Sequence, residues 1–237
     1  MRMLTAALAI LLGGLSSAGA HEVTAIDGLY FRRGQSRHLE ESLTLLQGLL
    51  ARAPDDPELL WRLARSLVRS GEGLPDRQDQ VRLFRRAEEA ARRAVERAPD
   101  SAEAHFWLGV AMARRGQARG VLSSLFMVGP LRREMAEVLR LEPRHGGAHH
   151  VLGQVYAQLP ALAGGDKDAA LREFELAVSL SPGYTVNYVV LAQAYAAAGR
   201  KDEARATLRR LFLVEQPADP ATLDQDLAEG RRLLEKL

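Results

Sequence analysis

The chain has 237 residues, of which 47% are hydrophobic, and it contains no cysteine. Hydrophobicity this high, with a formal net charge of only +2, excludes a disordered chain. The absence of cysteine excludes a disulfide scaffold, a thiolate metal site and a thiol nucleophile, and the small charge does not indicate a nucleic-acid-binding protein. Low aromatic content beside abundant alanine, leucine, arginine and glutamate favours an all-α fold.

The first twenty residues have the composition of a signal peptide. Arg2 is the only charged side chain among them, an apolar run extends from Met3 to Leu15, and small residues lead to Ala20. A charged start, an apolar centre and an Ala-x-Ala site are typical of a secretory signal, so we expect cleavage after Ala20. An uncleaved anchor is the alternative, although the apolar run is shorter than the roughly 20 residues of a membrane span. The sequence therefore predicts an exported protein, most simply periplasmic.

Four prolines divide the rest of the chain into units with a common pattern. They are Pro54, Pro99, Pro143 and Pro182. Nine residues after each comes a leucine, ten residues after a small residue, and thirteen residues after a large one. Seventeen residues after each comes a predicted helix terminator, and these are Gly71, Gly116, Pro160 and Gly199. Apolar residues before the later prolines are spaced by three and four, which puts them on one helix face. The pattern predicts about four helix hairpins in phase.

These positions resemble the tetratricopeptide repeat, a helix pair with small residues at its closest contacts and proline after the second helix. The last unit, from Tyr184 to about Val214, matches it most cleanly. The marker prolines are 45, 44 and 39 residues apart, against about 34 in that repeat. The extra residues fall between the two helices of each pair, where we expect longer helices or an irregular insertion. Beyond Leu213, a breaker followed by leucines predicts a closing helix over the last unit.

A closer resemblance extends from about Tyr30 to Leu237. The segments of this chain that carry the resemblance are residues 59–65, 102–109, 148–153, 159–160 and 164–167. With the insertions, they resemble the regulator of microtubule dynamics family and the T component associated with TRAP transporters, a periplasmic tetratricopeptide protein. The second resemblance implies an accessory that binds a periplasmic solute-binding protein, forms homo-oligomers and passes a hydrophobic ligand. Such components are often lipoproteins, whereas this chain has no cysteine to lipidate, so we expect a soluble protein.

We divide the chain into a signal peptide at residues 1–20, an N-terminal segment at 21–36 and a tetratricopeptide-like helical repeat domain at 37–237. The sequence contains no glycine-rich phosphate loop and no nucleophile elbow, and its carboxylates are scattered among arginines. We therefore expect a non-enzymatic binding protein with no catalytic residues, no cofactor and no metal.

Three histidines at the start of a predicted helix are the best candidates for a metal site. His145 and His149 have the i, i+4 spacing of two ligands, and His150 follows. A metal site needs three or four ligands, and no carboxylate lies in the same turn. The simpler interpretation is that His105 and His149 take a packing position usually given to an aromatic residue, with one ring nitrogen bonded. A hydrolase or metalloprotein is the weakest of the hypotheses.

The positions that would line the concave face of the repeats mix apolar, amide and cationic side chains. They are Trp61, Arg65, Phe106, Val110, His150, Gln154, Val189 and Gln193. This mixture suits a peptide, a protein segment or an amphipathic ligand. It lacks the lysine and asparagine set with which tetratricopeptide clamps hold a terminal carboxylate. Packing against neighbouring helices is the alternative role for these side chains.

The stretch Val121–Pro130 is the most apolar outside the signal and carries no charge. We favour its burial, because monomers rarely expose such a patch. If it is exposed, Leu125, Phe126 and Met127 would form an interface or the wall of an apolar pocket. Two functions remain: a periplasmic scaffold that binds another protein, or a carrier or conduit for a small hydrophobic ligand.

Overall fold

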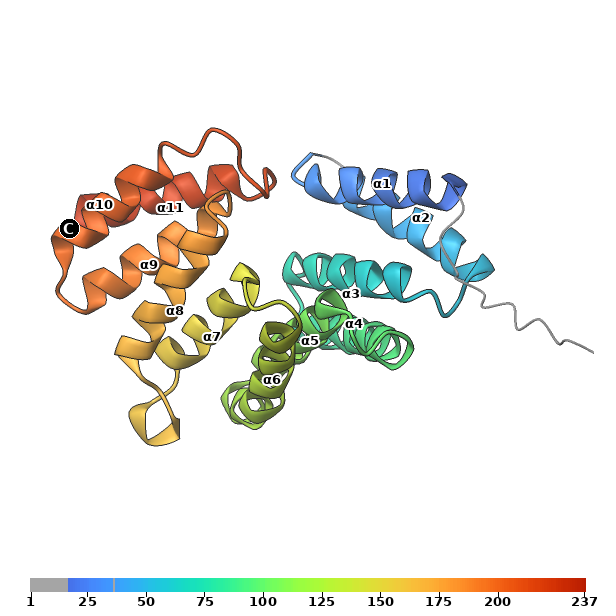
Figure 1. Cartoon of the computed structure of the whole chain (residues 1–237), viewed down its shortest axis with the longest axis horizontal. Helices are drawn as coiled ribbons and strands as arrows, with labels where there is room; N and C mark the ends of the chain where they lie inside the picture. Colours follow the sequence, from blue (N-terminus) through green and yellow to red (C-terminus); the bar gives the residue numbers. More distant parts are fainter. Residues whose placement is uncertain (1–16, 36) are drawn as a thin grey trace, which may run out of the picture.

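A computed structural model gives the fold and describes residues 17–35 and 37–237. Over these residues the chain forms eleven α-helices and one short 3-10 helix, which confirms the all-α prediction. The elements are α1 (Ser17–Phe31), α2 (His38–Arg52), α3 (Pro57–Glu72), α4 (Arg77–Arg97), α5 (Ala102–Arg119), α6 (Val121–Leu141), α7 (Gly146–Gln158), η1 (Ala161–Ala163), α8 (Lys167–Leu180), α9 (Thr185–Ala197), α10 (Lys201–Leu211) and α11 (Leu223–Lys236). Figure 1 shows that consecutive helices pair and that the pairs follow one another along an arc.

Successive helix pairs are joined by turns that contain the marker prolines, and three of the four turns end in a capping side chain. At the start of α3, Asp56 accepts hydrogen bonds from the backbone N–H groups of Glu58 and Leu59. At the start of α5, Ser101 accepts one from the N–H of Ala104. Such caps satisfy N–H groups that the first helical turn leaves unpaired. The four prolines therefore lie between the hairpins, as their spacing predicts.

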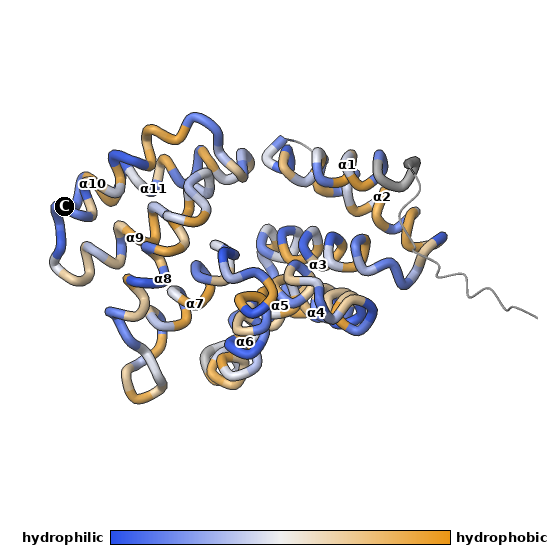
Figure 2. The backbone as a smooth tube through the Cα atoms, viewed as in Figure 1, coloured by the Kyte–Doolittle hydropathy of each residue, from blue (hydrophilic) through white to orange (hydrophobic). Residues whose placement is uncertain are grey.

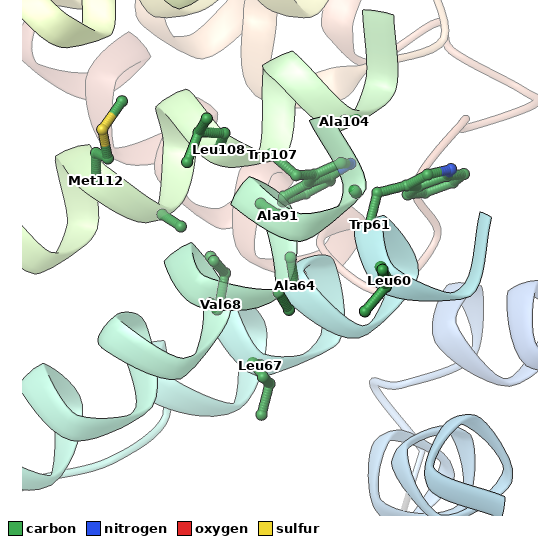
Figure 3. Packing of buried hydrophobic residues seen from close by; sticks show 14 residues of the cluster. Leu60, Trp61, Ala64, Leu67, Val68, Ala91, Ala104, Trp107, Leu108 and Met112 are labelled. Atoms are coloured by element: carbon green, nitrogen blue, oxygen red, sulfur yellow. The ribbon is translucent and has the colours of Figure 1, made fainter. Parts of the chain in front are cut away.

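Small residues set the distance between helices in the core of α3, α4 and α5. Ala64, Ala91 and Ala104 are fully buried, and Trp61 and Trp107 pack beside them (Figure 3). Small side chains at the crossing points let helix backbones approach, while the large rings fill the space between crossings. Figure 2 shows hydrophobic stretches of these helices gathered where they lie against one another.

The C-terminal helix closes the last hairpin, as predicted. The apolar cluster of α8, α9 and α10 includes the fully buried Leu208 and Leu211, and Leu227 and Leu233 of α11 pack against it. Without α11, this face of the last hairpin would be exposed to water, which is the usual reason for a capping helix at the end of a repeat array.

Gly71 and Gly116 do not end their helices, contrary to the sequence prediction. Both lie in the last turn, at places where the second helix of the pair comes close. A Cβ atom at Gly71 would lie 2.5 Å from the Phe84 ring, and one at Gly116 would lie 2.9 Å from the Met127 side chain. These glycines are therefore required by packing. Gly199 does end its helix as predicted, since it follows the C-cap residue Ala198 of α9 and has a φ of +77° that favours glycine.

Both expected uses of the extra residues occur, in different repeats. In the first two units they lengthen helices, since α4 and α6 have 21 residues each and α10 has 11. In the third unit they form an irregular segment between α7 and α8 that contains η1 and the left-handed residue Gly164. The superhelix is irregular for this reason.

The N-terminal segment at residues 21–36 contains most of α1, which packs against the repeats. Ile26 is fully buried and lies in one cluster with Leu46, Leu49 and Leu59 of α2 and α3. Figure 1 shows the end of α1 next to the loop that precedes α11, so the two ends of the arc meet.

Most of the predicted signal peptide, residues 1–16, lies outside the described residues. The predicted cleavage site after Ala20 falls within α1. None of the helices in the described part combines the length and the hydropathy that crossing a membrane requires.

A pair of glycine variants tests the packing of the hairpins. A Cβ atom at Gly153 in α7 would lie 2.6 Å from two ring carbons of the buried Phe174, so Gly153→Val should cost about 1–3 kcal/mol of unfolding free energy. Gly48 in α2 is exposed and has nothing within 4 Å of such an atom, so Gly48→Ala should stabilise by up to about 1 kcal/mol. Urea denaturation measures both, and shifts of the same sign would contradict this packing.

Candidate functional site

The inner side of the arc contains a cavity of about 540 Å³, here called the inner cavity. Its walls come from α1, α3, α5, the start of α7 and α9, with one residue from the loop before α11. Its aromatic lining consists of Tyr30, Phe31, Trp61, Phe106, Trp107 and Tyr184. Charged and amide side chains lie among these rings, so the cavity is amphipathic.

Four of the eight predicted concave-face residues meet at the inner cavity. Trp61 and Arg65 reach it from α3, Phe106 from α5 and His150 from α7. They come from three successive repeats, so the repeat register places them together although they are far apart in sequence.

The other four predicted residues lie elsewhere. Val110 and Gln154 line a separate pocket of about 70 Å³ between α5 and α7. Val189 is buried in the apolar core that α9 forms with α8 and α10, and Gln193 is exposed. The prediction that these two line the groove is wrong, because the cavity is bounded at this end by the first turn of α9 and the turn before it.

Sequence reasoning missed what the two ends of the chain contribute. Asp27 and Tyr30 of α1 and Asp219 of the loop before α11 also line the inner cavity. The spacing of Val23, Ile26 and Tyr30 is that of a helix face and could have indicated α1. The position of Asp219 depends on where the ends of the superhelix meet, which no local pattern reveals.

Asp27 is the carboxylate through which α1 is held to α3. Arg62 donates to it from Nε at 3.1 Å and from Nη2 at 3.0 Å. The Nη1 atom of Arg62 donates to the backbone and side-chain oxygens of Glu58. Burial by itself lowers the pKa of Arg62, but the hydrogen bonds to Asp27 and Glu58 outweigh it, so the pKa is raised. All three guanidinium nitrogens of Arg62 are therefore hydrogen-bonded within the protein, and the role of this cation is structural.

Arg65 also donates to Asp27, from Nη2, and it is stacked between rings. Its guanidinium carbon lies 3.7 Å from the ring centroid of Tyr30 and 5.2 Å from that of Trp61. Arg65 is 5% exposed, yet among the described residues neither its Nε nor its Nη1 has a hydrogen-bond partner. It is thus a buried cation with unused donors.

Arg69, one turn further along α3, fixes the position of Tyr30. Its Nε donates to the Tyr30 hydroxyl at 3.1 Å, and its Nη1 donates to Glu72 at 2.9 Å. Tyr30 therefore lies with its ring on Arg65 and its hydroxyl bonded to Arg69, so α1 and α3 form one continuous wall of the cavity.

The three clustered histidines have three different partners. His145 caps α7 by accepting a backbone N–H at Nδ1. The Nδ1 atom of His149 lies 2.7 Å from a Glu173 oxygen, and that of His150 lies 2.8 Å from the amide oxygen of Asn187. In the part of the chain that the structure describes, no group of three or more His, Cys, Asp or Glu side chains could hold a metal ion.

His105 and His149 occupy the same packing position in successive repeats. His105 lies 2.7 Å from Glu134, and its other ring nitrogen lies 2.9 Å from the carbonyl oxygen of Pro99. In the last repeat the corresponding Tyr188 donates to the carbonyl oxygen of Pro182 at 3.0 Å. The packing interpretation of these histidines is confirmed.

The protein around His150 disfavours its protonated form. Burial lowers its pKa to about 4, the bond to Asn187 opposes this only in part, and Arg114 and Arg69 add to the lowering. His150 is therefore neutral at neutral pH and acts as a hydrogen-bonding group in the cavity wall.

This burial predicts an acid dependence of stability. We expect the free energy of unfolding to fall as the pH drops from about 6.5 to about 4, because the unfolded chain then takes up a proton that folded His150 does not bind. The loss is about 1.4 kcal/mol per pH unit, or of order 3 kcal/mol in all. His150→Gln should remove this part of the dependence, as measured by urea denaturation between pH 7 and pH 4. Equal pH slopes in the two proteins would contradict the assignment.

The sequence predicts burial of the apolar stretch at the start of α6, but the structure leaves part of it exposed. Leu122 and Phe126 are 74% and 76% exposed, and Leu125 is 41% exposed. Met127 does pack, against Gly116 of α5. Because α5 covers only one side of these additional turns, the other side faces water. None of the pockets described above includes Leu125 or Phe126.

Known proteins share this architecture. Residues 25–159 match the family described as regulator of microtubule dynamics protein 1-3, and residues 161–237 match a tetratricopeptide repeat. Regulator of microtubule dynamics protein 1 of Mus musculus is 22% identical over 228 residues, which are 89% of this chain and 72% of that protein. The Bos taurus protein of that name is 24% identical over 70% of this chain and 56% of its own length.

Solved structures show the same fold. A thermophilic tetratricopeptide repeat protein of Thermus thermophilus superposes with a TM-score of 0.69 and 24% identity, over 90% of this chain and 98% of that one. MamA 41-end from Desulfovibrio magneticus RS-1 gives a TM-score of 0.50 and 15% identity, over 82% and 95%. At these identities the similarity shows the fold alone.

Proposed function

The chain belongs to the regulator of microtubule dynamics protein 1-3 family, and from its repeat architecture we propose that it is a scaffold that binds a segment of a partner protein in the inner cavity. The observation that carries this proposal is the cavity itself, about 540 Å³ on the concave side, with walls from several repeats. Helical repeat arrays use such concave surfaces for binding.

The lining of the cavity fits an extended protein segment. Rings such as Trp61 and Phe106 offer apolar contact area, while Asn187, His150 and Arg65 offer hydrogen bonds. A peptide has both kinds of group in alternation, whereas a purely apolar molecule would leave the unbonded donors of Arg65 without an acceptor.

A photo-crosslinking experiment tests this function. A photoreactive amino acid at Phe106, inside the cavity, should capture a specific partner from the native cell. The same amino acid at Arg85, which is exposed on the outer helix α4, should not. Capture of the same proteins from both positions, or of none from Phe106, would contradict the proposal.

We further propose that the protein acts outside the cytoplasm, because residues 1–20 have the composition of a signal peptide. The partner that the sequence resemblance implies is then a TRAP-type periplasmic solute-binding protein, rather than the microtubules in the name of the mouse relative. Sequencing the N-terminus of the protein from fractionated cells should give His21 in the periplasmic fraction. A protein that keeps Met1 and stays in the cytoplasm would contradict export.

A small amphipathic molecule is the second candidate for the occupant. The cavity volume lies in the range of about 300–1,000 Å³ that small-molecule sites have, and six aromatic side chains line it. Native mass spectrometry of protein purified without detergent should then show a bound mass that Phe106→Ala removes. A bare polypeptide mass under all conditions would exclude this function.

A further inference from the structure

We propose that the partner segment carries an acidic side chain next to an apolar one, and that Arg65 binds this carboxylate. The inference rests on the proposed function and specifies the chemistry of the segment that the inner cavity takes.

The unused donors of Arg65 are the first observation. A guanidinium has five N–H groups, and in the part of the chain that the structure describes Arg65 gives a hydrogen bond from Nη2 alone. Arg62, three residues earlier on the same helix, donates from all three of its nitrogens. Arg33 donates from both of its Nη atoms. Buried polar groups in native proteins are nearly always bonded, so Arg65, whose buried Nε has no partner, is an exception that still has donors to offer to an acceptor outside the chain.

The geometry leaves one edge of Arg65 available. Its guanidinium carbon lies 3.7 Å from the ring centroid of Tyr30 and 5.2 Å from that of Trp61, and the N–H groups of a guanidinium lie in its own plane. The Nε atom is buried, but Nη1 is not, and Arg65 is part of the cavity lining. An acceptor inside the cavity can therefore bond to Nη1.

The charge balance of this wall indicates that the acceptor is anionic. Asp27 is shared by Arg62 and Arg65, and Glu72 is shared by Arg69 and Arg114. Glu58 also pairs with Arg62, so the carboxylate that Arg65 contacts is one that it shares with a second arginine. A carboxylate is the anion that proteins supply, and it pairs well with a planar guanidinium.

A carboxylate that α5 contributes to the cavity favours one position for the acidic side chain. Glu103 accepts a hydrogen bond from the Trp107 indole at 3.1 Å and lies 3.7 Å from a ring nitrogen of His145. Its negative charge would repel a second carboxylate, so the acidic side chain belongs at Arg65 rather than beside Glu103. The Trp61 ring near Arg65 and the Phe106 ring of the same cavity would take an apolar side chain of the adjacent residue.

Selection from a phage-displayed random peptide library on the immobilised full-length protein tests this inference. We expect enriched peptides to share Asp or Glu next to a large apolar residue, and to bind Arg65→Met at least 10-fold more weakly than the wild type. Arg65→Lys keeps the charge but not the planar geometry and should lose part of the affinity. Arg85→Ala, an exposed arginine of α4, should bind as the wild type does.

A second measurement distinguishes the loss of a contact from misfolding of the Arg65→Met variant. Arg65→Met should fold, because Asp27 keeps its bonds to Arg62. Independently, changing the peptide's Glu to Gln should weaken binding to the wild-type protein by the same factor of 10 or more. Enriched peptides that lack an acid, or that bind Arg65→Met unchanged, would overturn the inference and leave cavity binding intact. Enrichment of no peptide at all would overturn the proposed function itself.

Discussion

Asp27→Ala is expected to lower the free energy of unfolding by about 3–5 kcal/mol and to release α1 from α3, because removing one partner of a buried ion pair leaves the other charge uncompensated. Asp27 accepts hydrogen bonds from both Arg62 and Arg65, which are 9% and 5% exposed. Arg62 keeps Glu58, but Arg65 loses the one acceptor that the described residues offer it. Separation of α1 from α3 would let water reach Arg65.

Urea denaturation measures the loss of stability, and hydrogen exchange of the α1 amides measures its release. The control lies on the same helix, because Glu22 pairs with Arg52 where both side chains are exposed, by 42% and 68%. Glu22→Ala should change stability by less than about 1 kcal/mol. If Asp27→Ala and Glu22→Ala unfold at the same urea concentration, the Asp27 cluster does not hold α1 in place.

The repeats could be predicted from sequence because each has the same short-range pattern of turn residues and helix-face residues at the same positions. Pro143 and Pro182 mark turns, and Ala170, Phe174 and Ala177 mark one helix face by their spacing alone. The same register placed Trp61 and Phe106 on one concave surface. Patterns of this kind depend on neighbours within a few turns, so a single sequence contains them.

The remaining features depend on contacts between distant parts of the chain. Gly116 has the composition of a helix end, yet Met127 from the next helix occupies the space beside it. Phe126 is apolar, yet no helix covers it among the described residues. The inner cavity is completed by α1 and by the loop before α11, and their positions follow from the accumulated curvature of the whole array. No local pattern encodes that curvature.

The contact that joins the two ends is an ion pair between Arg33, after α1, and Asp219, before α11. The two guanidinium Nη atoms donate to the two carboxylate oxygens at 2.8 and 2.5 Å, and the side chains are 8% and 9% exposed. Arg33 also lies 4.4 Å from the ring centroid of Tyr30, and Gly34 packs near the backbone of Ala221. This pair bridges 186 positions of sequence and closes the arc beside the cavity.

Arg33→Ala is therefore expected to open the arc, because Asp219 would be left buried without a counterion, at a cost of about 3–5 kcal/mol while the ends stay together. The chain has no cysteine, so spin labels can be attached after Glu40→Cys in α2 and Arg231→Cys in α11, both exposed positions. Electron–electron resonance should show a longer and broader label distance in Arg33→Ala than in the labelled parent. The double variant Arg33→Ala with Asp219→Ala should be more stable than Arg33→Ala alone, because it leaves no buried charge unpaired. An unchanged distance distribution in Arg33→Ala would mean that apolar contacts at the ends suffice to close the arc.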